Sequence, residues 1–455
     1  MTTPPTYDFS NLRDAHLHLL NHGKALAGVQ LADCSTVTEV LDRVGEAHRM
    51  LPAHSAKSPV WIDARGLRTE GLAERRYPTL AELDAVTPGR PAVLKSFDYH
   101  ALMGNTPALL EAGIETSTID PPAGVIVRDE SGTPTGVLLE AACNAMYDAQ
   151  PVDTSAQRAK QLALAVEDLR RRGFTEVHDM KASPQLAELL LEMDDRGELD
   201  GFAIQMYAVP DEFERVQKVM RFGMREDTNN PVRFAGLKLF IDGTLNSRTA
   251  WMLQPFADPI PAHPTGIPNY TPEQIEMYMR RAHHERFDIA AHAIGDGAVR
   301  ALLDAYEAVE KQFGEEPGFT LRIEHAQFID EADIPRFARP GKKRPVIASL
   351  QPCHLLTDME AIERLVPGRA GRAFPLKDLI DAAASAGRDP ADMIYLGSDS
   401  PIVPANPADN LQAAVHRRRA GMDADRAIAP EQAITREAAL GLHRSRIGRS
   451  GACEV

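Results

Sequence analysis

Short runs of apolar and β-branched residues recur along the chain, and helical patterns of apolar positions lie between them. Eight such runs predict strands, at residues 12–19, 174–180, 201–210, 233–242, 288–294, 321–327, 345–352 and 393–399. Amphipathic helical spacing of apolar positions appears at residues 155–172, 271–284 and 297–313. The alternation of strand and helix predicts a parallel sheet of the α/β class, and eight units predict a closed (β/α)8 TIM barrel.

Two local signals predict where helices begin and end. Gly173 directly follows the helical pattern of residues 155–172, at a position where helices commonly end on glycine. Thr271 stands three residues before Gln274, which fits a capping box at the start of the next helix.

The stretch from about Gln30 to Gln150 does not follow the strand and helix alternation, and it is rich in proline and glycine. It contains one hairpin signal, GVIVRDESGTPTGVLLE, with a turn at residues 129–134. We interpret residues 30–150 as a long insertion after strand 1, and residues 8–29 with 151–445 as the barrel. Long insertions at the carboxyl end of a barrel typically cover the active site, so we expect this one to cover the mouth.

Composition and charge limit the classes of partner and location. The 455 residues are 44% hydrophobic and 25% charged, as in globular proteins, and the net charge of −15 disfavours nucleic acid and anionic membranes as partners. No apolar run approaches the ~18 residues of a membrane span, and MTTPPTYDFS lacks the pattern of a signal peptide. The four cysteines form no C-x-x-C pair and suit a reducing compartment. We therefore expect a cytoplasmic protein that acts on a small molecule, and a homodimer because such dimers are the commonest assembly.

Side chains that can bind or assist a metal ion recur near the ends of the predicted strands. In chain order they are His16, His18, Lys238, His292, His325 and Asp399. The two histidines of the His-x-His pair share one face of a strand. The carboxyl ends of barrel strands converge on one pocket, where imidazole and carboxylate groups suit divalent ions. The alternative is coincidence among 15 histidines, but few of them fall within strand signals and four of those lie near strand ends.

Longer motifs extend this pattern. DAHLHLL, GLKLFIDGTLNSRTAWM, HAIGDGAVRALLDAYE, RIEHAQFID and GSDSPIVPANP follow one another in the chain. The sequence from about Phe9 to about Leu440 thereby resembles the amidohydrolase superfamily, and within it the YtcJ-like metal-dependent amidohydrolases, which include N-substituted formamide deformylase. The resemblance implies that the six residues above form the metal site. Relatives also build a small β-sandwich from their terminal segments, and because 15 residues precede His16 here, we expect that sandwich to be absent or reduced.

The resemblance also implies the chemistry. We expect one or two divalent ions, zinc or a similar metal, with Lys238 carboxylated and bridging two ions or, in a one-metal site, acting as a neutral or hydrogen-bonding group. The catalytic residues are then Asp399, Lys238 and His325. Metal-activated hydroxide would cleave an amide or formamide C–N bond, with Asp399 as general base and then acid.

Four further residues are candidates for substrate binding. His100 and Asn105 match a family pattern within the insertion, His178 ends the second strand, and Asp242 follows the fourth. The alternatives for function are a deaminase, a lactonase or phosphoesterase, and a non-catalytic scaffold. A structural zinc site is disfavoured because the candidate ligands include no cysteine.

Overall fold

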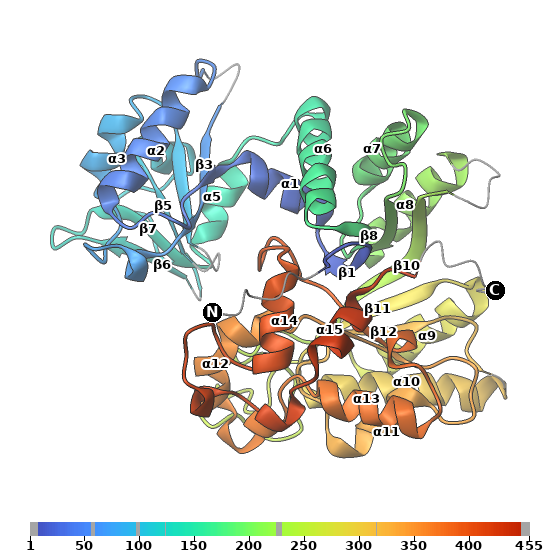
Figure 1. Cartoon of the computed structure of the whole chain (residues 1–455). Coiled ribbons are helices and arrows are strands. Elements are labelled where there is room, and N and C mark those ends of the chain that lie inside the picture. The colour runs from blue at the N-terminus through green and yellow to red at the C-terminus, as the bar shows by residue number, and fades with distance from the viewer. Residues whose placement is uncertain are drawn as a thin grey trace, which may run out of the picture. The chain divides into compact units, whose positions relative to one another are not determined.

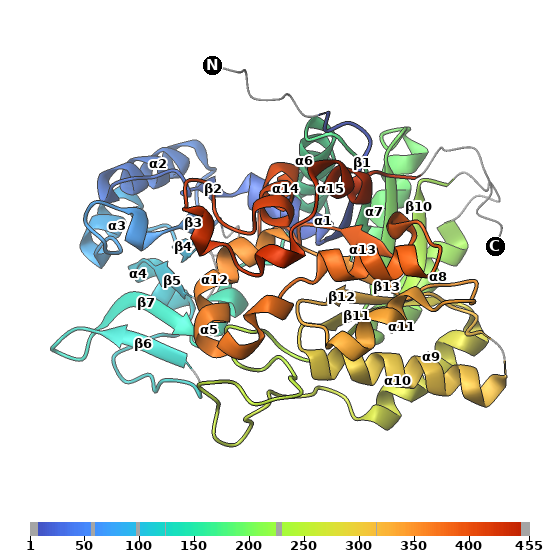
Figure 2. The same cartoon turned by 60° about the horizontal axis from the view of Figure 1, so that its bottom comes forward.

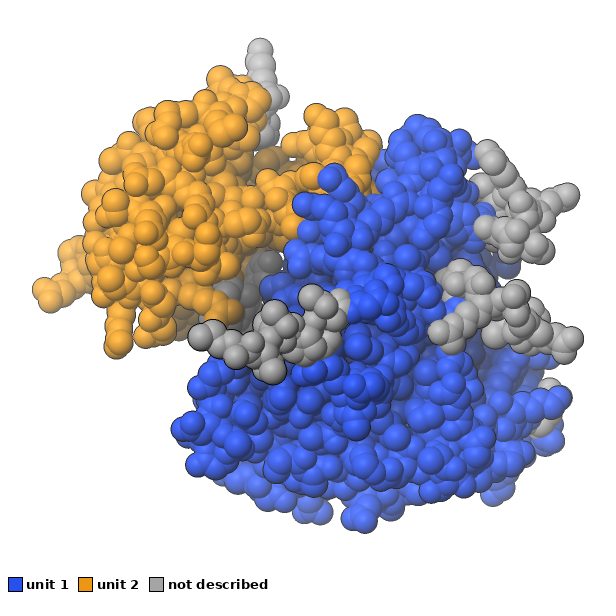
Figure 3. Space-filling model, in the orientation of Figure 1, with its two compact units in different colours: residues 1–19, 166–455 blue, residues 20–165 orange. Residues whose placement is uncertain are grey.

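The computed structural model describes residues 8–55, 60–96, 101–122, 124–223, 230–314 and 316–446. The chain divides into two compact units, coloured separately in Figure 3. One comprises residues 1–19 and 166–455, and the other comprises residues 20–165.

The larger unit contains a sheet of eight parallel strands (Figure 1). In sheet order these are β1 (Leu12–Leu17), β8 (Phe174–Asp179), β9 (Ala203–Ala208), β10 (Val232–Phe240), β11 (Asp288–Ala293), β12 (Leu321–His325), β13 (Ile347–Leu350) and β14 (Ile394–Leu396). A parallel bridge between Leu17 and Ser400 brings the last strand back to the first. All eight predicted strands are confirmed, and they form a nearly closed barrel of the TIM type.

Helices alternate with these strands. They are α6 (Ser155–Arg171), α7 (Pro184–Asp195), α8 (Pro210–Gly223), α9 (Pro272–Glu285), α10 (Asp296–Phe313), α11 (Ile334–Ala338), α12 (Cys353–Leu365), α13 (Leu376–Ser385), α14 (Pro407–His416) and α15 (Arg436–His443). Figure 2 shows α9 and α10 side by side near β11. The predicted capping box of Thr271 and Gln274 is confirmed at the start of α9. Gly173 follows α6 with φ of 88°, and a Cβ atom there would lie 1.5 Å from the Phe9 carbonyl oxygen, so only glycine fits.

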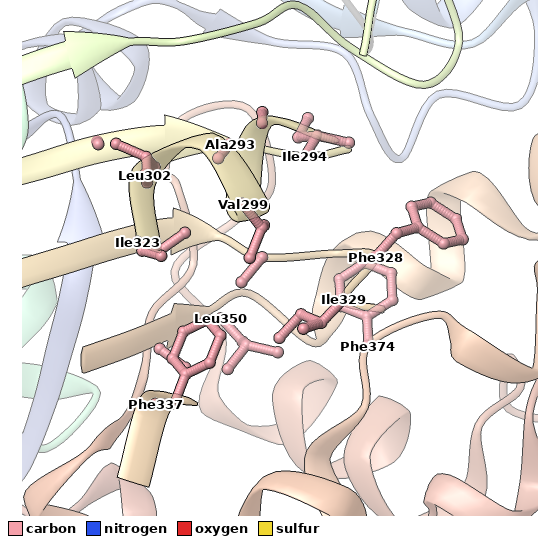
Figure 4. Close-up of a cluster of buried hydrophobic side chains, with 14 of the residues drawn as sticks. Ala293, Ile294, Val299, Leu302, Ile323, Phe328, Ile329, Phe337, Leu350 and Phe374 are labelled. Atoms are coloured by element: carbon pink, nitrogen blue, oxygen red, sulfur yellow. The ribbon is translucent and has the colours of Figure 1, made fainter. Parts of the chain in front are cut away.

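The main apolar core of this unit lies between the strands and the helices outside them. Figure 4 shows part of it, where Ile323 of β12 and Leu350 of β13 lie near Val299 and Leu302 of α10 and Phe337 of α11. All of these side chains are buried. The burial of apolar surface against the helices fixes the strands, and therefore the side chains that the strands carry at their ends.

The smaller unit has its own six-stranded sheet, ordered β2-β3-β4-β5-β7-β6. The strands are β2 (Val29–Gln30), β3 (Ile62–Leu67), β4 (Ala92–Ser96), β5 (Ala101–Gly104), β6 (Gly124–Arg128) and β7 (Pro134–Glu140), and the helices are α1 (Leu19–Ala27), α2 (Val37–Met50), α3 (Leu80–Val86), α4 (Thr106–Glu111) and α5 (Cys143–Ala149). The predicted hairpin is confirmed as the antiparallel pair β6 and β7.

The sheet of the smaller unit is buried on both faces. Leu94 and Met103 belong to one apolar cluster, which includes residues of α2 and α3. Val93 and Leu102, the neighbouring positions on the same strands, belong to a second cluster with residues of α4 and α5. Alternate residues of a strand point to opposite faces, so helices cover both sides of this sheet.

None of the described helices is both long and apolar enough to span a membrane.

Candidate metal centre

The strand ends of the barrel bring the predicted ligands together. His16 is in β1, His292 in β11, and His325 is the last residue of β12. Asp399 lies three residues beyond the end of β14, and its backbone N–H donates to the His16 carbonyl at 2.6 Å. Lys238 lies in β10, where it pairs in register with Ala290 of β11.

The distances describe one compact site. His16, His325 and Asp399 each offer a ligand atom, and these atoms lie within 4.8 Å of one another. Asp399 Oδ1 is 3.2 Å from His18 Nε2 and 3.5 Å from His16 Nε2. The ring of His292 is centred 4.4 Å from that of His325. The five side chains therefore surround a volume in which one or two ions would have several ligands.

Lys238 is fully buried beside this group. Within the described part of the chain its Nζ has no hydrogen-bond partner. Burial lowers the pKa of Lys238 to about 8, although the negative charges of Glu324 and Asp399 act in the opposite direction. A substantial fraction of this amine is therefore neutral near pH 8, and a neutral amine can act as a nucleophile.

Burial and the neighbouring groups together also favour, in the other candidate ligands, the protonation states that bind a cation. It lowers the pKa of His16 to about 4 and that of His292 to about 3, and the charge of Lys238 adds to both shifts. Burial alone would raise the pKa of Asp399, but His16 and His18 outweigh it and hold that pKa well below its usual value. Neutral imidazoles and an ionised carboxylate are the ligand forms of these residues.

The orientation of His292 is fixed by a backbone carbonyl. Its Nε2 donates to the Gly243 carbonyl oxygen at 3.1 Å, since a carbonyl oxygen can only accept. The proton on Nε2 leaves the lone pair on Nδ1 free for an ion.

The backbone at the ends of β12 and β14 is unusual. His325 and Asp399 have φ of 71° and 62°, the left-handed region that costs free energy for residues other than glycine. Gly397 just before Asp399 allows close approach, because a Cβ atom there would lie 2.5 Å from the His16 backbone nitrogen. Buried Asp14 accepts a hydrogen bond from Ser398 Oγ at 2.6 Å, which holds the segment before Asp399 against β1.

Asp242 and His178, two predicted substrate-binding residues, are both buried in hydrogen-bond networks. Asp242 accepts from three backbone N–H groups, those of Trp251 at 2.8 Å, Ile294 at 3.0 Å and Gly295 at 2.9 Å. It thereby ties the segment after β10 to the start of α10. His178 lies between Glu176 and Arg322, with Nε2 2.9 Å from Glu176 Oε1 and Nδ1 2.7 Å from Arg322 Nη1.

Of the two predicted substrate-binding residues in the smaller unit, only Asn105 lies among the described residues. His100 lies outside the described residues. Asn105 is the N-cap of α4, with Oδ1 accepting from the backbone of Ala92 and Ala108, and Nδ2 donating to Thr87 Oγ1 and the Arg90 carbonyl. Each of its hydrogen-bonding positions is used within this unit.

Sequence reasoning missed Arg322 and Glu324, which lie beneath the metal centre. Both are buried on β12, and Glu324 Oε2 is 2.7 Å from His16 Nδ1. The available signal was a pair of opposite charges at i and i+2 in an apolar strand, directly before His325. Such a pair lies on one face of the strand, and here that face is the interior of the barrel.

Comparison with known proteins agrees with this geometry. The model of the Amidohydrolase family matches residues 12–447. The chain belongs to the amidohydrolase family. It is 29% identical over 418 residues to YtcJ of Bacillus subtilis, which is named as an amidohydrolase, covering 90% of this chain and 73% of that protein. It is 28% identical over 443 residues to the N-substituted formamide deformylase of Arthrobacter pascens, covering 94% and 77%.

A solved structure extends the similarity to the fold. A metal-dependent hydrolase of Pyrococcus horikoshii superposes with a TM-score of 0.71 at 26% identity, over 95% of this chain and 79% of that one. This amidohydrolase is accordingly a metal-dependent hydrolase, with His16, His325 and Asp399 as a candidate metal site.

The residues present fit a divalent ion. Buried nitrogen atoms without a hydrogen-bond partner among the described residues include His18 Nδ1, Lys238 Nζ and His325 Nδ1. Buried polar atoms are normally satisfied, and such a concentration at one place indicates a bound group. The donor set of imidazoles and a carboxylate suits zinc and similar metals.

Proposed function

We propose that this amidohydrolase cleaves a C–N bond, of amide or formamide type, in a small molecule. The observation that carries the proposal is the convergence of four histidines, a lysine and an aspartate on one end of the barrel. The similarity to a protein named N-substituted formamide deformylase supports the bond type.

His16, His18, His292, His325 and Asp399 would hold one or two ions, with zinc suited to this ligand set. A bound ion supplies Lewis-acid chemistry, because it polarises a carbonyl oxygen and lowers the pKa of water. We further propose that Lys238 is carboxylated. Its neutral amine would attack CO2 and release one proton, and the resulting carbamate would add a negatively charged oxygen ligand to the set that holds the ions.

Asp399 would carry the proton. Its carboxylate is ionised, because the neighbouring imidazoles hold its pKa low. It can therefore accept a proton from the attacking water and donate it to the leaving nitrogen as the C–N bond breaks. The short distances from Asp399 Oδ1 to His16 Nε2 and His18 Nε2 support this role.

The first experiment is elemental analysis of the purified protein and of two lysine variants. We expect about two ions per chain in the wild type, as in two-metal hydrolases, and fewer in Lys238→Ala. Lys95→Ala is the matched control, since Lys95 is also buried but pairs with Asp63 in the smaller unit, and its metal content should equal that of the wild type. One ion in both the wild type and Lys238→Ala would remove Lys238 from the ligand set.

Activity on a small panel then tests the bond type. The panel contains an N-substituted formamide, a simple amide, a lactone, a phosphotriester and a cytosine-like substrate. Turnover of the formamide or amide, abolished in Asp399→Asn, supports the proposal. Turnover of the lactone or the cytosine-like substrate alone would replace it with the corresponding activity, and a wild type without metal after growth in supplemented medium would favour a scaffold.

A further inference from the structure

A chain of buried hydrogen bonds crosses the barrel interior and ends at the metal centre. Its members, all at most 7% exposed, are Ser445, Glu176, His178, Arg322, Glu324 and His16. The first part of the chain measures 2.6 Å from Ser445 Oγ to Glu176 Oε2 and 2.9 Å from Glu176 Oε1 to His178 Nε2. His178 Nδ1 is then 2.7 Å from Arg322 Nη1. The last part measures 2.9 Å from Arg322 Nε to Glu324 Oε1 and 2.7 Å from Glu324 Oε2 to His16 Nδ1. The proposed mechanism uses only its last member.

The direction of each bond follows from Arg322, because a guanidinium donates and never accepts. Glu324 Oε1 therefore accepts from Arg322, and the ion pair between them keeps Glu324 a carboxylate. A carboxylate is an acceptor at both oxygens. At 2.7 Å from Glu324 Oε2, His16 Nδ1 must then be the donor.

This direction decides which nitrogen of His16 faces the site. With the proton on Nδ1, the lone pair lies on Nε2, which is 3.5 Å from Asp399 Oδ1. Only that tautomer can bind a metal ion through the nitrogen that points to the site.

We infer that Glu324, itself held by Arg322, is a positioning residue that fixes His16 as the Nδ1–H tautomer and presents Nε2 to the metal. This inference rests on the proposed role of His16 as a ligand. A general contribution to stability explains the arrangement less well, since a buried ion pair is often no more stabilising than apolar residues of similar volume. Arg322 donates in addition to the Ala15 carbonyl at 2.7 Å, which anchors it to the strand that carries His16.

Glu324→Gln tests the inference because the hydrogen bond from Arg322 determines which end of the new amide group faces His16. The amide oxygen must accept from Arg322 Nε, so the NH2 group faces His16 Nδ1. His16 then has to accept at Nδ1 and carry its proton on Nε2, which blocks the ligand position. We expect the Kd for Zn²⁺, measured by competition with a chelator, to rise about 10–100-fold.

Glu176→Gln is the matched control. It removes a carboxylate from the same buried chain but leaves the bond between Glu324 and His16 intact, so we expect the Kd for Zn²⁺ to equal that of the wild type. Unchanged Zn²⁺ affinity in Glu324→Gln, or an equal loss in both variants, would overturn the inference.

A second measurement reads the tautomer on the wild type itself, and a variant serves only to assign the signal. Histidine ¹⁵N NMR of the metal-free wild type reports which ring nitrogen carries the proton, and His16→Asn assigns the signal by its loss. We expect the Nδ1–H form, and the Nε2–H form would overturn the inference. The two proposals fail separately, because a wild type that binds no Zn²⁺ contradicts the proposed function, whereas an Nε2–H signal in a zinc-binding wild type contradicts only the role of Glu324.

Discussion

Asp242 shows how a single carboxylate can hold the backbone around a site. Its two oxygens accept from the backbone N–H groups of Trp251, Ile294 and Gly295, and the side chain is buried. The Gly243 carbonyl next to it accepts from His292. Asp242 therefore acts on the candidate ligand His292 through the backbone that it holds.

Asp242→Asn should destabilise the protein. An amide has one acceptor oxygen and an NH2 group that cannot accept, so at least one buried N–H loses its partner, at a cost of about 1–3 kcal/mol. The measurement is the free energy of unfolding in denaturant. Asp258→Asn is the control, because exposed Asp258 pairs with Arg248 at the surface and its loss should change stability by less than about 0.5 kcal/mol.

A variant Asp242→Asn with wild-type stability but a raised KM would instead make Asp242 a substrate contact, as the sequence suggested.

Among the secondary-structure elements, α9 offers a local test of how sequence sets a helix start. Thr271 accepts from the Gln274 backbone, and the Gln274 side chain accepts from the Thr271 backbone, so two N–H groups of the first turn are satisfied. Thr271→Ala should lower the free energy of unfolding by about 1 kcal/mol, whereas Thr271→Ser, which keeps the hydroxyl, should change it little. Equal losses in both variants would show that the methyl group, not the cap, matters.

The barrel elements could be predicted because their signals are local. Each strand is a short apolar run, and ligands at strand ends such as His325 converge wherever the barrel closes. The strands Ile62–Leu67 and Ala92–Ser96 of the smaller unit were missed, because their sequences, IDARGL and AVLKS, mix charged residues and glycine with apolar ones. The stretch interpreted as an insertion, in which only a hairpin was predicted, is a folded sheet with helices on both faces.

The role of Glu324 could not be predicted for a different reason. A buried charge needs partners, and its partners here come from strands far away in the sequence, with His16 308 residues from Glu324 and His178 144 residues from Arg322. No local pattern distinguishes such a pair from charges on an exposed strand face. The candidate metal ligands were easier to find because the chemistry of histidine limits the roles that such side chains can have.

At the scale of the whole molecule, residues 443–445 contact residues 11–13 and so join segments from opposite ends of the barrel unit. Leu12 in β1 bridges to Arg444, and the Ser445 backbone donates to the Asn11 carbonyl at 2.9 Å. His443 at the end of α15 is fully buried in the same junction, and its Nδ1 donates to the Arg13 carbonyl at 3.2 Å. The stability of this junction therefore depends on His443 remaining neutral.

Acid should weaken this junction in a defined pH window. Burial lowers the pKa of His443 to about 4 from the ordinary value of 6.5. Above pH 6.5 the ring is neutral in both states and its contribution is complete. Between these values the unfolded chain binds the proton and the folded one does not, so stability falls as the pH falls, by about 3 kcal/mol in total.

His443→Asn separates this contribution from the rest of the protein. Asparagine can still donate to the Arg13 carbonyl but does not titrate. Denaturant unfolding of metal-free wild type and variant at pH 7, 5.5 and 4.5 should show the wild type losing more stability than the variant as the pH falls. Metal-free protein is used because acid would otherwise release the metal by protonating the candidate ligand histidines. The protonation of these histidines is common to both proteins, so its effect on stability cancels in the difference. Parallel pH dependences would mean that His443 has the same pKa in the folded protein as in the unfolded chain. The junction around His443 would then not be the cause of the loss of stability in acid.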